Sequence, residues 1–160
     1  MNLDTLRGKL EILSVVEIPN YILGDIQKFK NYDPTRIIHY ELKGNHLCIY
    51  MEENKRLEAM EEFRSTVEAL QYQVERKGSP LVRSFESFQF DTDLANLIFV
   101  VKKELFERDF TAKVIEKSIV EDALKYQIYS RKAIGVRVYY RDAESNKLIR
   151  ECIYPKSSER

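Results

Sequence analysis

The sequence is poor in the residues on which catalytic and metal-binding sites commonly depend. Its 160 residues include two histidines, two cysteines and no tryptophan. Histidine is the side chain that most readily exchanges protons near neutral pH, and structural zinc sites are built from cysteine and histidine. The sequence also lacks a glycine-rich phosphate loop and a G-x-S-x-G nucleophile elbow. We therefore favour a protein that is not an enzyme, and we expect no cofactor and no bound metal.

The sequence also lacks the features of a secreted or membrane protein. Cys48 and Cys152 each lie in an apolar run, which predicts two reduced thiols in a reducing compartment, although a disulfide between them stays open. The N-terminal residues are charged throughout and lack the basic start, apolar stretch and cleavage site of a secretory signal. No apolar run is long enough to cross a bilayer. We expect a cytoplasmic protein with no membrane contact.

Glycine and proline are scarce as well, with five and four residues. This leaves little room for flexible linkers between domains. A hydrophobic fraction of 44% in a chain of this length is enough to bury a core without metals or disulfides. We expect residues 1–160 to form a single globular domain in which only the last few residues are flexible.

The net charge is zero, because 26 basic residues balance 26 acidic ones. This balance does not favour a protein that binds polyanions over its whole surface. The distribution is uneven, however. From Lys125 to the C-terminus there are nine basic and four acidic residues, so this segment carries +5 and the remainder carries −5. Any electrostatic function is therefore expected near the C-terminus.

Apolar spacing in the first third of the chain predicts two helices followed by a hairpin. The helices are expected over residues 3–13 and 19–33, although the stretch "LEILSVVEI" also fits a strand. Gly44-Asn45 lies between two apolar runs and predicts a tight hairpin in which Lys43 faces His46.

The rest of the chain contains one strong helical pattern and several shorter elements. A helix is predicted from Asn54 to about Lys77, an aromatic strand from Leu81 to Phe90, and helices over 94–105 and from about Thr111 to about Arg131. A second hairpin follows over 134–154. These elements predict an α+β fold, in which an antiparallel sheet built from two hairpins plus an aromatic-rich strand packs against four to five helices.

The second hairpin, "IGVRVYYRDAESNKLIRECIY", carries most of the C-terminal positive charge. If Arg141 faces Lys147, one side of the hairpin is apolar except for Arg150, and Arg137 lies opposite Glu151 on the other side. The candidate residues for binding a protein or nucleic acid are Lys132, Arg137, Tyr139, Arg141 and Lys147. They would supply cations and a stacking ring. The structural alternative is a solvated sheet face with locally matched charges.

Two further clusters bear on catalysis. His39 and His46 lie four residues apart along the predicted hairpin strands, on the order of 13 Å, which is too far for both to bind one zinc ion. In "DPTRIIHYELKG", Asp33, Glu41 and Lys43 form an acidic residue followed by E-x-K. In this the chain resembles the metal-dependent restriction-endonuclease-like nucleases. The resemblance implies that the two carboxylates hold Mg²⁺ and that the lysine helps to activate water.

Together these patterns favour a non-catalytic binding or accessory subunit of a larger assembly, which contacts a protein through its basic C-terminal hairpin. Contact with nucleic acid and self-association stay open. The alternative function is a Mg²⁺-dependent nuclease that uses Asp33, Glu41 and Lys43.

Overall fold

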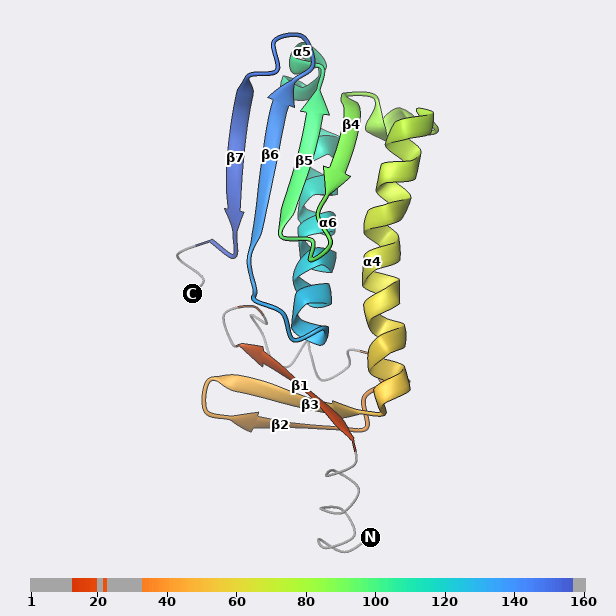
Figure 1. The fold of residues 1–160 in the computed structure, drawn as a ribbon, viewed down its shortest axis with the longest axis vertical. Helices are drawn as coiled ribbons and strands as arrows, with labels where there is room; N and C mark the ends of the chain where they lie inside the picture. The colour runs from red at the N-terminus through yellow and green to blue at the C-terminus, as the bar shows by residue number, and fades with distance from the viewer. Residues whose placement is uncertain (1–12, 20–21, 23–32, 157–160) are drawn as a thin grey trace, which may run out of the picture.

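The computed structural model describes residues 13–19, 22 and 33–156. They form an α+β fold with two separate sheets that share two long helices (Figure 1). The smaller sheet is antiparallel and has the order β1-β3-β2. Its strands are β1 (Ser14–Pro19), β2 (His39–Lys43) and β3 (His46–Met51).

The larger sheet has four strands in the order β4-β5-β6-β7. They are β4 (Phe85–Phe90), β5 (Asn96–Val101), β6 (Val136–Asp142) and β7 (Leu148–Tyr154). β5 and β6 pair in parallel, whereas the two outer pairs are antiparallel. A parallel pair needs a long crossover connection, which α5 (Lys103–Glu107) and α6 (Phe110–Tyr129) provide.

Two long helices connect the sheets. α4 (Glu53–Arg76) begins beside the smaller sheet and runs along the β4 edge of the larger one, and the short helix η1 (Pro80–Val82) follows it. α6 lies behind the larger sheet (Figure 1). The main core lies between the larger sheet and the two helices. In it the rings of Phe88, Phe99 and Tyr140 stack across three strands. The ring centroids of Phe88 and Phe99 are 4.4 Å apart, and those of Phe99 and Tyr140 are 5.2 Å apart. The smaller sheet packs Leu47, Ile49 and Met51 in a second core against the other ends of the helices.

The α+β class is confirmed, but the single antiparallel sheet is wrong. The two hairpins belong to different sheets, and the described residues contain three α-helices instead of the four to five expected. The helix predicted from Asn54 and the one predicted from Thr111 are present as α4 and α6. Most of the two helices predicted over 3–13 and 19–33 lies outside the described residues, and Pro19 is the last residue of β1.

The helix predicted over 94–105 is a strand followed by the short helix α5. Asp91 precedes this strand and caps the β4–β5 turn. Its carboxylate accepts hydrogen bonds from the backbone N–H of Ala95 at 2.7 Å and of Asn96 at 3.1 Å. The run Asn96–Val101 then continues as a strand, because its branched and aromatic residues fit a sheet that is covered on one side.

The register of the first hairpin is confirmed, with Lys43 paired to His46. The register predicted for the second hairpin is wrong, by two residues at Arg137 and by one at Arg141. Arg137 pairs with Ile153, and Arg141 pairs with Leu148 instead of Lys147. The pairing passes from Arg150 directly to Leu148, so Ile149 is an extra residue in a β-bulge.

Neither cysteine is in a disulfide, and they lie in different sheets. Among the described residues, no helix combines the length and the apolar character needed to cross a membrane.

Candidate binding surface

One face of the four-stranded sheet carries no helix among the described residues. α6 packs against the opposite face, as Figure 1 shows. Because side chains alternate along a strand, β5 directs Leu97, Phe99 and Val101 into the core and directs Ile98 and Val100 the other way.

Strand pairing identifies the other residues of this face, because directly paired residues share one side of a sheet. Ile98 pairs with Tyr139, and Val100 pairs with Arg141. We call this surface the open sheet face. Its members are Ser87, Gln89, Asn96, Ile98, Val100, Arg137, Tyr139, Arg141, Leu148, Glu151 and Ile153.

Several members of the open sheet face are apolar. Leu148 and Ile153 are 47% and 46% exposed, although both are large aliphatic residues. Ile98, Val100 and Tyr139 are half-buried. The face therefore presents apolar side chains on β5, β6 and β7, and the strand pairing places Arg137, Arg141 and Glu151 among them.

A shallow groove of about 530 Å³ lies over β4, β5 and β6. Ile98, Tyr139 and Arg141 form part of its lining, together with Gln89 and Asn96. An aromatic ring and a guanidinium group therefore lie beside an aliphatic residue and two amides. This combination suits contact with a polypeptide, whose surface also mixes apolar and hydrogen-bonding groups.

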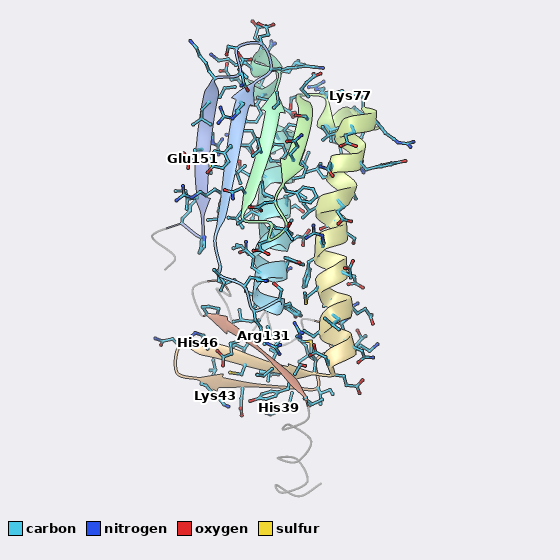
Figure 2. All side chains as sticks on the ribbon, in the orientation of Figure 1. His39, Lys43, His46, Lys77, Arg131 and Glu151 are labelled. Carbon is cyan, nitrogen blue, oxygen red and sulfur yellow. The ribbon has the colours of Figure 1, made fainter. Side chains whose placement is uncertain are left out.

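The charges on the open sheet face are partly matched within the molecule. Arg137 Nη1 lies 3.7 Å from Glu151 Oε1, and Figure 2 shows Glu151 on the outer strand β7. Arg141 Nη1 donates a hydrogen bond of 3.3 Å to the backbone carbonyl of Asn146. The face has cations, but it does not have a strong excess of them.

The carboxylate of Asp91, in the β4–β5 turn, also lines the groove. Partial burial opposes its ionisation, but hydrogen bonds from Asn96 and Ala95 outweigh this effect and lower the pKa of Asp91. The groove therefore contains an ionised carboxylate at neutral pH, at the β4–β5 turn.

The buried side chain of Gln127 holds the open sheet face in place from behind. Its amide nitrogen donates to the backbone carbonyls of Gly135 at 2.9 Å and Asp93 at 3.2 Å. Its amide oxygen accepts from the N–H of Gly135 at 2.9 Å. These bonds tie α6 to the chain just before β5 and just before β6.

The structure brings together three of the five candidate residues predicted from the sequence. Arg137, Tyr139 and Arg141 all lie on the open sheet face through β6. Lys147 precedes β7 at the turn end of the hairpin, next to Arg141 in space because Asp142 N–H bonds to the Lys147 carbonyl at 2.9 Å. Lys132 lies between α6 and β6, at the other end of the strand, and is not part of this face.

Sequence reasoning missed the contributions of β4 and β5, above all Ile98 and Val100. The helix predicted over 94–105 includes both. The signal that would have found them is the uninterrupted apolar run Leu97–Val101, which is short for a helix and typical of a buried strand.

The second sequence-predicted cluster lies on the smaller sheet, where Figure 2 labels His39, Lys43 and His46. Tyr50 Oη donates a 2.6 Å hydrogen bond to Glu41, and Lys43 Nζ lies 3.2 Å from the same carboxylate. Hydrogen bonds from Tyr50 and Lys43 lower the pKa of Glu41, and the same contacts raise the pKa of Lys43. Glu41 and Lys43 are therefore both ionised, and they form an ion pair with each other.

Asp33 does not join this pair. Its carboxylate accepts hydrogen bonds from Thr35 at 2.8 Å and from Arg36 at 2.9 Å, and Arg36 also binds Glu58 and Glu62 of α4. In the part of the chain that the structure describes, no three His, Cys, Asp or Glu side chains are grouped so that they could hold a metal ion.

Comparison with known proteins found no matching family model, no matching curated protein and no matching solved structure. The functional assignment therefore depends on the geometry of the open sheet face.

Proposed function

We propose that this protein is a non-catalytic binding subunit that docks a protein partner on the open sheet face. The observation that supports it is the sheet face that no helix of the described residues covers, on which apolar side chains of β5, β6 and β7 surround Arg137 and Arg141. Protein interfaces combine an apolar centre with aromatic and arginine side chains. Ile98, Tyr139 and Arg141 provide this combination around one groove.

A protein partner fits this face better than nucleic acid does. Binding to a phosphate backbone depends on unbalanced cations, which release counterions from the polymer. Here Arg137 is matched by Glu151, and Asp91 places a negative charge in the groove. Exposed Leu148 and Ile153 add apolar area that a phosphate backbone would leave unused.

The size of the face limits the strength of the contact. Four strands of six or seven residues, spaced about 4.8 Å apart with a rise of about 3.3 Å per residue, give roughly 400 Å² of flat surface. A standard stable interface buries about 800 Å² on each partner. The open sheet face alone therefore suits a transient contact, or one part of a larger interface within an assembly.

We place this activity in the cytoplasm. Cys48 and Cys152 are both free thiols, and unpaired thiols persist in reducing compartments.

The structure does not favour the nuclease alternative. Magnesium-dependent cleavage by this motif needs Asp33 and Glu41 to converge on one ion. Instead, Arg36 engages the Asp33 carboxylate, and Tyr50 and Lys43 engage that of Glu41.

Site-specific photocrosslinking tests the proposal. A benzophenone amino acid is placed at Tyr139 on the open sheet face or, as a matched control, at Tyr72, which is 54% exposed on α4. Irradiation in the producing cells should give a discrete protein adduct from position 139 and none of that mass from position 72. The variant Arg141→Glu, made with the crosslinker at 139, should reduce the adduct.

Three results would count against the proposal. Adducts that nuclease treatment removes would show that the partner is nucleic acid. The same adducts from both positions would show that the contact is not specific to the face, and no adduct from position 139 would show that the face is free in the cell.

A further inference from the structure

A second cavity lies outside the open sheet face, beside the start of α6. It has a volume of about 470 Å³ and is bordered by the end of α5, the first turn of α6 and the bulged part of β7. We call it the α6–β7 pocket. Its volume lies within the range of small-molecule sites, roughly 300–1,000 Å³.

The apolar lining of the α6–β7 pocket consists of Phe106, Phe110, Ala112 and Ile149. Phe110 is 77% exposed, although it is the first residue of a helix that is otherwise well packed. An exposed phenylalanine gains stability from any contact that removes its ring from water. Ile149 reaches the pocket because it is the extra residue of the β7 bulge.

The polar lining is dominated by cations, namely Arg108, Lys113 and Arg150. Arg150 lies on the core-facing side of β7, where the residues that flank it are Tyr140, its paired residue, and Cys152. Its Nε lies 3.1 Å from Cys152 Sγ, which leaves the two terminal nitrogens of the guanidinium for other acceptors.

The acid beside Arg150 is Glu116, and it accepts no hydrogen bond from these two nitrogens. Glu116 Oε1 lies 3.7 Å from Arg150 Nη2, beyond hydrogen-bond distance. The two oxygens of Glu116 already accept hydrogen bonds from the hydroxyls of Tyr140 and Tyr154. Arg150 therefore has a carboxylate beside it for charge balance, but it keeps hydrogen-bonding capacity toward the pocket.

Two further acids, Asp109 and Glu107, border the pocket, so its lining holds three cations and two carboxylates. Asp109 is only 7% exposed, and its oxygens accept hydrogen bonds from Ser84 and Thr111. Glu107, at the end of α5, is exposed to solvent. Three cations therefore border a pocket in which one of the two acids is directed into the protein.

We propose that the α6–β7 pocket binds a small aromatic anion, whose ring contacts Phe110 and Ile149 and whose acidic group binds Arg150 and Lys113. A carboxylate or sulfonate accepts two hydrogen bonds from a guanidinium, which gives the ligand a defined orientation. This site is independent of the open sheet face, because Arg150 and Arg141 lie on opposite sides of the sheet.

Titration with 8-anilinonaphthalene-1-sulfonate tests this proposal, since the probe is an aromatic sulfonate whose fluorescence increases in an apolar site. The pocket variants are Phe110→Ala, Lys113→Gln and Arg150→Gln. The matched control is Arg137→Gln, which removes the same charge as Arg150→Gln but on the open sheet face. All variants are compared by circular dichroism and thermal unfolding.

We expect saturable binding of one probe molecule whose Kd rises at least ten-fold in Arg150→Gln and about five-fold in Phe110→Ala and in Lys113→Gln. The Kd should stay unchanged in Arg137→Gln. Phe110 and Lys113 are exposed, so their variants remain decisive if loss of Arg150 disturbs the Glu116 cluster. No saturable binding, or binding insensitive to Phe110→Ala and Lys113→Gln, would overturn the proposal.

Discussion

Asp109 shows how a single polar residue can be fixed by partners that are distant in the sequence. It is the N-cap of α6, and its carboxylate accepts a 3.0 Å hydrogen bond from the backbone of Thr111. The second oxygen accepts a 2.7 Å bond from the buried hydroxyl of Ser84, which precedes β4. The capping role is readable from sequence, but the bond to Ser84 depends on the tertiary fold.

These bonds give Asp109 a pH-dependent effect on stability. Burial raises the pKa of the carboxyl group, but the hydrogen bonds from Thr111 and Ser84 outweigh it and lower the pKa of Asp109 below its ordinary value. The ionised form therefore stabilises the fold above the unfolded-state pKa of about 3.9, and this contribution is lost as the pH falls through the lower folded-state pKa.

We predict that Asp109→Asn lowers the free energy of unfolding by about 1–2 kcal/mol at pH 7, because charged hydrogen bonds are replaced by weaker neutral ones. The difference from wild type should shrink as the pH falls below about 4. Urea unfolding across this range measures it. Asp93→Asn, at an exposed aspartate, controls for the change in net charge. A penalty that stays constant from pH 7 to pH 3 would contradict this explanation.

The environment of Arg150 could be predicted from the sequence only in part. Its position in the otherwise apolar side of the second hairpin was visible from the alternation of residues. Its partner Glu116 was not, because Glu116 lies more than thirty residues earlier in the sequence and the placement of α6 against β7 is set by packing. In the described residues, every buried side-chain nitrogen or oxygen has a hydrogen-bond partner.

Elements with strong local signals were predictable, whereas long-range pairing was not. The hairpin around Gly44 follows from its turn residues, and Gly44 has the positive φ of 60° that such a turn requires. The lengths of α4 and α6 follow from their apolar spacing. The strand β5 was missed because its apolar residues also fit a helical spacing, and its parallel partner β6 lies about forty residues away.

Gln127 links three elements that carry the open sheet face. Its side chain is fully buried and bonds to Gly135 and Asp93, at the entrances to β6 and β5. We predict that Gln127→Ala lowers the free energy of unfolding by about 2–4 kcal/mol, because it leaves the part-buried N–H of Gly135 without an acceptor and creates a cavity. Chemical denaturation gives the value, and Gln73→Ala, at an exposed glutamine of α4, is the matched control.

Hydrogen exchange would localise the effect of Gln127→Ala. Amides at the start of β5 and β6 should exchange faster, while those of β2 and β3 in the smaller sheet stay protected. A loss of stability below 0.5 kcal/mol, or equal changes in both sheets, would contradict the role assigned to Gln127.

At the scale of the whole molecule, the two sheets differ in how they are covered. The smaller sheet packs against the lower ends of α4 and α6 (Figure 1), whereas the larger one keeps a free face. The sequence predicted Arg137, Tyr139 and Arg141 on one side of a hairpin, and this alternation is present. It did not predict the apolar area beside them, because that area comes from β5 through a parallel pairing with no local signal.

The most direct test of the open sheet face as an interface is the affinity of the protein recovered by the crosslink at position 139. Its Kd is measured by isothermal titration calorimetry for wild type, for Ile98→Asp combined with Tyr139→Ala, and for Tyr72→Ala on α4. We predict that the open-face double variant raises the Kd more than ten-fold, which corresponds to about 1.4 kcal/mol, while Tyr72→Ala binds as wild type does. Equal affinities for all three proteins, with folding intact, would show that the partner binds elsewhere.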